Sequence, residues 1–389
     1  KVYQNIKFFV FDPAASVVKI RNDFSFTNLD KYDFHYIVRH HGKEIYKGRI
    51  KDIKAEPGQT VTSPFLNGIP ATNSSTGDVR IEFYAAIRTP EPFLPAGTVI
   101  AREQTYVHTF HKEDAPKQAF AGSEEDDRQV VFSGPHFKAT FDKQSGLLVS
   151  YRYKKQEYIH NGQGPRPFFW RAPTDNDYGA KLPVRLKAWK EASYQEPKAE
   201  SYTVVRDKAP TAVKVTYSFP QAEAPTEITY MVDGNGVIKV ENHFVAENAQ
   251  TPMIPRVGLR MQLPARITSL TYYGRGPEEN YRDRRTSQFI GEYTSGIQDM
   301  YEPYVRPQEN NHRTDIYWCT LTSKAKEGLL FVADRTFEMN VSNYPLESLD
   351  SGDSIENGSP RTEKTNHRHL TDPHPEPSVA LFIDYRMRG

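Results

Sequence analysis

An alternation of apolar and polar side chains near the amino-terminal end is the feature that most constrains the fold of this chain. Apolar residues stand at Val18, Ile20, Phe24 and Phe26, and Asn22 is the single break in the apolar row. Because successive side chains along a strand point to opposite faces, this period of two predicts a half-buried β-strand with the four apolar side chains on its core face.

Stretches with the same period follow, separated by turn residues. Phe34, Tyr36 and Val38 precede the turn at residues 41–43, which predicts a hairpin. Several short strands within the first 112 residues are typical of an immunoglobulin-like β-sandwich, and we assign residues 1–112 to one. The later strands expected in it are residues 61–64, 79–88 and 99–110.

The rest of the chain predicts a linker and a second, larger sandwich. Residues 113–129 are polar and include the acidic run 124–127, which predicts an interdomain linker, with an acidic interaction tail as the alternative. Residues 130–389 return to strand patterns with turn signals at 142–146 and 233–236, and they fit a large antiparallel β-sandwich. Within it, Pro183, Leu186 and Trp189 predict one short amphipathic helix lying on a sheet.

Composition supports an all-β chain and excludes several classes of partner. The 23 Tyr, 22 Phe and 28 Pro favour strands and turns over long helices. The formal net charge of +1 gives no electrostatic footprint for nucleic acid or an anionic membrane surface. No apolar run approaches the roughly 20 residues that span a bilayer. The chain opens without an initiator Met, and we expect it to be part of something longer.

The residue types that could carry catalysis do not form a complete catalytic set. Glycoside hydrolysis needs two carboxyl groups across the scissile bond, and Glu278-Glu279 is the obvious pair. Adjacent residues of an extended segment point to opposite faces, so a structural role for one and solvent for the other is favoured. Asp175-Asn176-Asp177 lacks the alternating ligands and distal Glu of an EF-type calcium loop, which favours a turn whose side chains bond its own backbone.

The remaining candidates also favour structural roles. His367 and His369 would share a strand face, with His374 nearby, but ordinary pairing is favoured over a metal site. The single cysteine, Cys319, lies in an apolar run, excludes an internal disulfide and is expected to be a small core hydrophobe. The Asn-x-Ser matches at Asn73, Asn340 and Asn357 matter only if the source glycosylates. The residues alone therefore indicate an accessory or binding module.

Several segments resemble, in the same order, the C-terminal third of the lac-type β-galactosidases of glycoside hydrolase family 2. Residues 168–179, FFWRAPTDNDYG, are similar to the family's R-A-P-x-D-N-D-x-G segment. Residues 273–284, YGRGPEENYRDR, are similar to its G-x-G-P-x-E-N-Y-x-D-R segment, and residues 304–310 and 366–370 match two further stretches. Residues 94–104 look like the end of the preceding immunoglobulin-like domain.

The resemblance implies a place within a larger enzyme. Family members consist of a jelly roll, an immunoglobulin-like domain, a TIM barrel, a second immunoglobulin-like domain and a galactose-mutarotase-like supersandwich, and this chain resembles the last two. The barrel of the same polypeptide would supply the two Glu of a retaining reaction on β-galactosides, with magnesium and sodium beside them. The resemblance also implies a homo-oligomer. Past Gly389 the family continues through a glycine-rich stretch and closing strands, so the sandwich is expected to be truncated.

The resemblance assigns expected roles to two groups of residues, with no catalytic, cofactor or metal site in this chain. Residues of the first group either border the substrate cleft or only fix a turn and a domain contact: Arg171, Asp175, Asn176 and Asp177. Residues of the second group are expected to form a structural polar network that supports the sheet: Arg275, Glu279, Asn280, Tyr281 and Asp283.

Two other interpretations stay open. One is a stand-alone carbohydrate-binding or scaffolding module, which exposed aromatic side chains in a groove would favour. The second is a naturally split enzyme whose small chain associates with a catalytic partner. Trp170, Trp189 and Trp318 are the only tryptophans, and two of them lie in runs that predict burial, which favours the β-galactosidase region.

Overall fold

The structure, a computed structural model, divides the chain into two compact units. It describes residues 3–12, 16–65, 77–108, 122–205, 211–222, 225–244, 253–350, 355–356, 359–360 and 373–387. Unit 1 comprises Lys1–Glu113 with the short segments Tyr273–Pro277 and Arg284–Tyr293, and unit 2 comprises the rest. Nearly every element is a β-strand, so the expectation of an all-β chain is confirmed.

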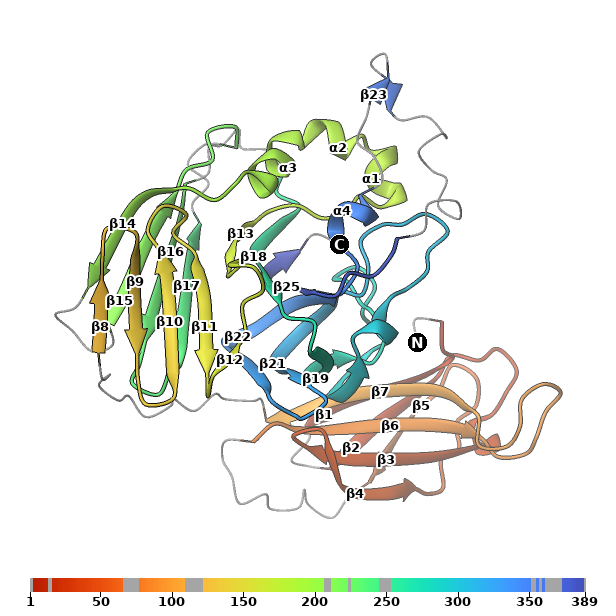
Figure 1. The fold of residues 1–389 in the computed structure, drawn as a ribbon. Coiled ribbons are helices and arrows are strands. Elements are labelled where there is room, and N and C mark those ends of the chain that lie inside the picture. Colours follow the sequence, from red (N-terminus) through yellow and green to blue (C-terminus); the bar gives the residue numbers. More distant parts are fainter. Residues whose placement is uncertain are drawn as a thin grey trace. The chain divides into compact units, whose positions relative to one another are not determined.

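Unit 1 contains two antiparallel sheets, coloured red to orange in Figure 1. The three-stranded sheet has the order β1 (Ile6–Asp12), β2 (Val17–Asn22), β5 (Thr60–Pro64). The four-stranded sheet has the order β4 (Lys43–Ile50), β3 (Tyr32–His40), β6 (Val79–Ile87), β7 (Val99–His108), and the short 3-10 helix η1 spans Leu29–Lys31. The hairpin expected around residues 41–43 is the β3–β4 pair.

The core of unit 1 follows the alternation read from the sequence. In β3, Tyr32, Phe34, Tyr36 and Val38 are buried, while the residues between them are half-buried. They belong to one apolar cluster, in which Phe8 stacks on Phe83 with ring centroids 5.7 Å apart. Such burial of alternate side chains between two sheets is what stabilises a sandwich.

The expectation that Phe26 faces the core is wrong. Strand β2 ends at Asn22, whose buried side chain donates hydrogen bonds to the carbonyl oxygens of Thr27 (2.8 Å) and Ala55 (2.9 Å). Its Oδ1 accepts a hydrogen bond from the Phe24 N–H, which turns the chain away from the strand direction. Phe24 packs against the core, whereas Phe26 is 97% exposed.

Unit 2 contains two antiparallel sheets in its first half. The five-stranded sheet has the order β12 (Gln156–Glu157), β11 (Leu148–Tyr153), β10 (Phe137–Asp142), β9 (Gln129–Ser133), β8 (Gly122–Glu125). The four-stranded sheet has the order β14 (Ala199–Val205), β15 (Thr211–Tyr217), β16 (Thr226–Val232), β17 (Ile238–Phe244). The rings of Phe141 and Tyr230 pack against each other, with centroids 5.2 Å apart, so the two sheets share a core.

Part of the expected linker is instead an edge strand. Gly122–Glu125 pairs with β9, where it covers one side of Val130–Phe132. Its acidic side chains are exposed, which suits an edge strand because charges there discourage pairing with other chains. Glu125 also forms an ion pair with Lys143 at 2.6 Å.

A seven-stranded sheet has most of its strands in unit 2 and the residues Tyr273–Gly276 and Phe289–Tyr293 in unit 1. Its order is β13 (Arg166–Phe168), β18 (Arg256–Leu263), β25 (Val379–Met387), β22 (Gly328–Ser342), β21 (Arg313–Ser323), β19 (Ile267–Gly276), β20 (Phe289–Gly296). The remaining elements are α1 (Asp175–Gly179), α2 (Leu182–Arg185), α3 (Lys187–Tyr194), η2 (Gln298–Met300), α4 (Leu346–Leu349) and the strand pair β23 (Ile355–Glu356) and β24 (Ser359–Pro360). Because β18, β25 and β22 are neighbours, residues far apart in the sequence meet on this sheet.

The expected amphipathic helix is present but is divided at Leu186 into α2 and α3. Pro183 lies in the first turn of α2, and Leu186 and Trp189 are buried as predicted. Trp189 packs against Phe169 and Phe244. The helix therefore contributes Trp189 to an aromatic cluster of unit 2.

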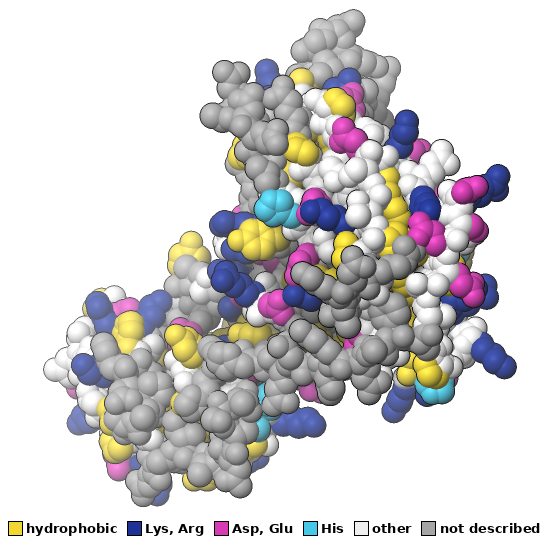
Figure 2. Space-filling view, turned by 90° about the vertical axis from the view of Figure 1, so that its left-hand side faces the viewer, with side chains coloured by type: hydrophobic (Ala, Val, Ile, Leu, Met, Phe, Trp, Pro, Cys, Tyr) yellow, Lys and Arg dark blue, Asp and Glu magenta, His cyan; other side chains and the backbone are white. Residues whose placement is uncertain are grey.

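The structure also bears on three further features of the sequence: its cysteine, its lack of a long apolar run and its near-zero net charge. Cys319 is fully buried, as expected of a core residue. Among the described residues, no helix combines the length and the apolar character that a membrane span requires. Figure 2 shows basic and acidic side chains interspersed on the face that it draws, in keeping with the net charge of +1.

Candidate functional site

The candidate site is the segment 168–179, which follows β13. Three consecutive aromatic residues fix its start, because Phe168, Phe169 and Trp170 are each buried to 98% or more. The indole N–H of Trp170 donates a hydrogen bond to Asp350 Oδ2 at 2.9 Å, so the one polar atom of this ring also has a partner. The backbone is thus held where the polar part of the segment begins.

A buried ion pair and a capping box shape the next residues. Thr174 is the N-cap of α1, and its hydroxyl accepts a hydrogen bond from the Asp177 N–H while Asp177 Oδ2 accepts one from the Thr174 N–H. Arg171 donates two hydrogen bonds to the same carboxylate, at 3.1 and 2.8 Å. Both side chains of this pair are buried. Arg171 and Asp177 therefore fix the turn and present no free surface.

Asp175 and Asn176 point outward instead. The Asp175 carboxylate is 66% exposed and forms an ion pair with Arg306 at 2.7 Å. The Arg306 guanidinium also lies 5.1 Å from the centre of the Tyr178 ring. Of the four residues expected at the cleft border, only Asp175 and Asn176 are exposed. These two side chains can donate to or accept from a hydroxyl-rich ligand.

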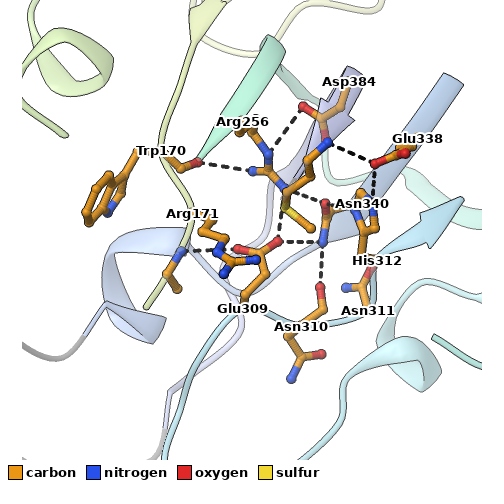
Figure 3. Close-up of polar contacts among 12 residues, drawn as sticks. Trp170, Arg171, Arg256, Glu309, Asn310, Asn311, His312, Glu338, Asn340 and Asp384 are labelled. Atoms are coloured by element: carbon orange, nitrogen blue, oxygen red, sulfur yellow. Dashed lines mark hydrogen bonds and ion pairs between the residues drawn. The ribbon is translucent and has the colours of Figure 1, made fainter. Parts of the chain in front are cut away.

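A group of charged and amide side chains, all buried except Arg282, contacts this segment through Glu309 and is called here the Arg256 cluster; Figure 3 labels all of its members but Arg282. Its members come from β18, β22, β25 and two loops: Arg256, Arg282, Glu309, His312, Glu338, Asn340 and Asp384. Arg256 is fully buried and donates through Nη2 to Glu309 Oε1 at 2.9 Å and to Asn340 Oδ1 at 2.6 Å. Such a cation is stable in the interior only because acceptors surround it.

Glu309 connects the cluster to the candidate site. One carboxylate oxygen accepts from Arg256 and from Asn340 Nδ2, and the other accepts from the Ala172 N–H at 3.1 Å. The Glu309 N–H donates in return to the Ala172 carbonyl. Ala172 lies between Arg171 and Pro173, so this reciprocal pair holds the middle of the segment.

Two acids of the cluster, Asp384 and Glu338, have pKa values that are shifted in opposite directions. Burial raises the pKa of Asp384 to about 7, although the nearby Arg256 acts to lower it. Neither Asp384 oxygen has a hydrogen-bond donor among the described residues, and Arg256 Nε lies 3.2 Å away as an ion partner. Burial also acts to raise the pKa of Glu338, but the hydrogen bonds from His312 and Met387 and the charge of Arg282 outweigh it, so the pKa of Glu338 is lowered.

The second motif supplies a neighbouring polar group. Glu279 accepts hydrogen bonds from the Tyr304 hydroxyl and from the Asn311 N–H. Asn280 is fully buried, and its Oδ1 accepts from both the N–H and the hydroxyl of Thr314. The backbone N–H of Asn280 donates to the His312 carbonyl at 2.8 Å, which brings this motif to the edge of the Arg256 cluster.

The other residues predicted for the structural polar network differ in their burial and their partners. Tyr281 is buried and stacks on His312 with ring centroids 5.2 Å apart. Arg275 donates to the Gln288 carbonyl at 2.9 Å, and Asp283 is exposed. Glu278 is exposed whereas Glu279 is bonded inward, so the adjacent pair points apart as expected.

Most of the Arg256 cluster was missed by reasoning from the sequence. Asn340 stood out only as a glycosylation match, but its side chain is 96% buried and fully engaged. The sequence did contain a signal for Asp384, because it is the one acid within the apolar run VALFIDY, and an acid at such a position needs buried partners. The match at Asn73, the match at Asn357 and the motif at 366–370 lie outside the described residues.

No metal site emerges from the histidines or acids that the structure describes. In the described ranges, no group of three or more His, Cys, Asp or Glu side chains is arranged to hold a metal ion. His367 and His369 fall in an undescribed stretch, and His374 is exposed.

Two family models, several β-galactosidases and one solved structure match this chain. A family model described as "Beta galactosidase small chain" matches residues 133–389, and one described as "Beta-galactosidase, domain 4" matches residues 18–108.

A β-galactosidase of Priestia megaterium is 29% identical and aligns with 95% of this chain and 36% of its own length. Those of Streptococcus thermophilus and Lactobacillus delbrueckii subsp. bulgaricus are 30% and 31% identical, over 90% and 89% of this chain and 33% of each relative. The chain thus spans about a third of the length of these relatives. A solved structure from Salmonella typhimurium, assigned as a mutarotase, is 13% identical with a TM-score of 0.29 and covers 70% of this chain and 97% of that one.

Proposed function

The chain belongs to the β-galactosidase small-chain family, and on this premise we propose that it is a non-catalytic region of a retaining β-galactosidase. In this proposal, a catalytic barrel elsewhere in the same polypeptide cleaves terminal β-galactosides such as lactose, with magnesium and sodium at its own site. The present region supports the cleft and the assembly of a homo-oligomer.

The inward orientation of three motif carboxylates, those of Asp177, Glu279 and Glu309, is the observation that carries the proposal. A retaining glycosidase needs two carboxyl groups about 5 to 5.5 Å apart on either side of an accessible glycosidic bond. Asp177 is bonded to Arg171, Glu279 to Tyr304 and Asn311, and Glu309 to Arg256. Carboxylates engaged in this way hold the backbone in place, which supports a scaffolding role.

Hydrolysis of a nitrophenyl β-galactoside by this chain alone tests the proposal. We expect no turnover above buffer at high protein concentration with magnesium and sodium present. Turnover that disappeared in Glu279→Gln or Glu309→Gln would place a reaction site within this chain and refute the proposal. Glu278→Gln, at the exposed neighbour of Glu279, is the matched control.

Within the parent enzyme, we propose that Asp175 and Asn176 border the substrate cleft while Arg171 and Asp177 hold the segment. Replacing either outward residue by Ala is expected to raise KM severalfold without changing Tm, because an exposed ion pair contributes only about 0 to 1 kcal/mol. Asp177→Ala should instead lower Tm, because it leaves Arg171 buried without its acid. An unchanged KM in both Asp175→Ala and Asn176→Ala would remove these residues from the cleft.

A further inference from the structure

The histidine of the Arg256 cluster faces hydrogen-bond acceptors on both sides of its ring. His312 is 99% buried, with Nδ1 2.8 Å from Asn340 Oδ1 and Nε2 3.1 Å from Glu338 Oε2. A neutral imidazole has one N–H donor and one lone pair, so it can satisfy only one of two acceptors. The protonation of His312 therefore depends on whether both neighbours are truly acceptors.

The orientation of the Asn340 amide is fixed by its other partners. Its Nδ2 donates to Glu309 Oε1 at 2.9 Å and to the Asn310 carbonyl at 2.6 Å, and both of these atoms only accept. Its Oδ1 accepts from Arg256 Nη2, a group that only donates. Exchanging the amide oxygen and nitrogen would break all three contacts. The atom that faces His312 Nδ1 is therefore an acceptor.

Glu338 is held in its ionised form. Oε2 accepts from the Met387 N–H at 2.9 Å, and Oε1 forms an ion pair with Arg282 at 2.5 Å. These partners favour the carboxylate over a carboxylic acid that would donate a proton to His312.

The remaining surroundings also favour a cation at His312. The Tyr281 ring lies against the imidazole at an interplanar angle of 26°, and aromatic faces attract positive charge. The ionisable members of the Arg256 cluster are Arg256, Arg282, Glu309, Glu338, Asp384 and His312 itself. Arg313, next in sequence, directs its guanidinium to the Asn311 and His312 carbonyls and to the Tyr272 hydroxyl. A proton on His312 gives the cluster three cations and three potential anions.

We infer that His312 carries a proton on both ring nitrogens at neutral pH and that this imidazolium is a pH-sensitive lock on the 168–179 segment. The lock acts through a continuous path of hydrogen bonds from His312 to Asn340, from Asn340 to Glu309, and from Glu309 to the Ala172 N–H. The Glu338 carboxylate holds the Nε2 proton, so the Nδ1 proton is the one lost, and its loss leaves a lone pair that faces Asn340 Oδ1. The path is then broken at its first step, and the segment loosens.

Histidine-selective ¹⁵N NMR of the full chain tests the protonation state. At pH 7.5 we expect the His312 resonances to show a proton on both ring nitrogens. His312→Gln identifies the signals among the 12 histidines by their loss. If that variant fails to fold, Tyr281→Leu identifies them through the lost ring stacking. A neutral ring with one bare nitrogen overturns the inference.

Glu338→Gln tests the protonation of His312, and hydrogen exchange tests the lock. A Gln side chain can donate to Nε2, so His312 in this variant is expected to lose its Nε2 proton at pH 7.5 and to keep the Nδ1 proton that bonds Asn340, which leaves the 168–179 amides protected. In the wild type, exchange of the 168–179 amides, corrected for intrinsic rates, should rise at least tenfold as pH increases through the loss of the His312 proton. A segment whose protection is unaffected by that loss refutes the lock. Glu227→Gln, on β16 and half-buried, is the matched control, and its exchange should follow the wild type.

Discussion

Replacing Asp384 by Asn should make unit 2 more stable at alkaline pH. Asp384 is fully buried, and neither of its oxygens has a hydrogen-bond donor in the described ranges. Arg256 is its ion partner at 3.2 Å but also has Glu309, so the cation keeps an acid when Asp384 is neutralised. Asn has nearly the same shape as Asp, which keeps the packing against Gly258 intact.

The size of the effect follows from the raised pKa of Asp384. Burial raises it from 3.8 to about 7, so between these values the folded chain holds a proton that the unfolded chain has released. The free energy of unfolding therefore falls as pH rises across this window, by about 1.4 kcal/mol per pH unit and about 4 kcal/mol in all. Asn cannot ionise, so the stability of Asp384→Asn relative to the wild type should grow by about 3 kcal/mol between pH 5 and pH 8.

Urea unfolding followed by tryptophan fluorescence measures this difference directly. All three tryptophans lie in unit 2, so the signal reports the unit that contains Asp384. Taking wild type minus variant at each pH cancels the contributions of the other titrating groups. Exposed Asp283→Asn is the control and should show no pH-dependent difference. A difference for Asp384→Asn that is the same at pH 5 and pH 8 would refute the reasoning.

Three further predictions concern other buried positions. Gly258→Ala would place a Cβ 2.1 Å from Asp384 Oδ1 and should destabilise unit 2 by about 2 to 4 kcal/mol in the same urea assay, whereas Gly179→Ala, which meets open space, should be nearly neutral. Burial raises the pKa of the Cys319 thiol well above its usual range, so it should not react with Ellman's reagent in the native chain and should react fully once urea unfolds it. Asn22→Ala removes the hydrogen bonds to the Thr27 and Ala55 carbonyls and the acceptor of the Phe24 N–H, and should lower the stability of unit 1 by about 2 kcal/mol, as measured by calorimetry; no loss would contradict the role given to this side chain.

The sequence predicts the local structure well because alternation and turn chemistry act over a few residues. Phe34, Tyr36 and Val38 are buried as their spacing required. The failure at Phe26 has a physical cause that was visible as the one break in the pattern. Asn22 interrupted the apolar row because its side chain bonds backbone groups from two other segments, and those partners cannot be identified from spacing alone.

The Arg256 cluster could not be predicted, because its contacts depend on which strands become neighbours. Arg256 and Asp384 are 128 residues apart and meet because β18 pairs with β25, and Glu338 joins them because β25 also pairs with β22. Alternation tells which face of a strand is buried but not which strand lies beside it. The sequence therefore located the motifs and left their common anchor undetected.

The position of the motifs around this cluster suggests why they occur together. The 168–179 segment reaches it through Ala172, the 273–284 segment through Asn280 and Tyr281, and the 304–310 segment through Glu309. Removing one partner of a buried charge leaves the other uncompensated, at a cost of about 3 to 5 kcal/mol, so these residues depend on one another for stability. Asp175 and Asn176 lie outside this dependence because they are exposed. The four residues expected at the cleft border thus separate into a buried pair that holds the segment and an exposed pair that we propose contacts a ligand, and among these four only substitutions in the exposed pair should change substrate binding without changing stability.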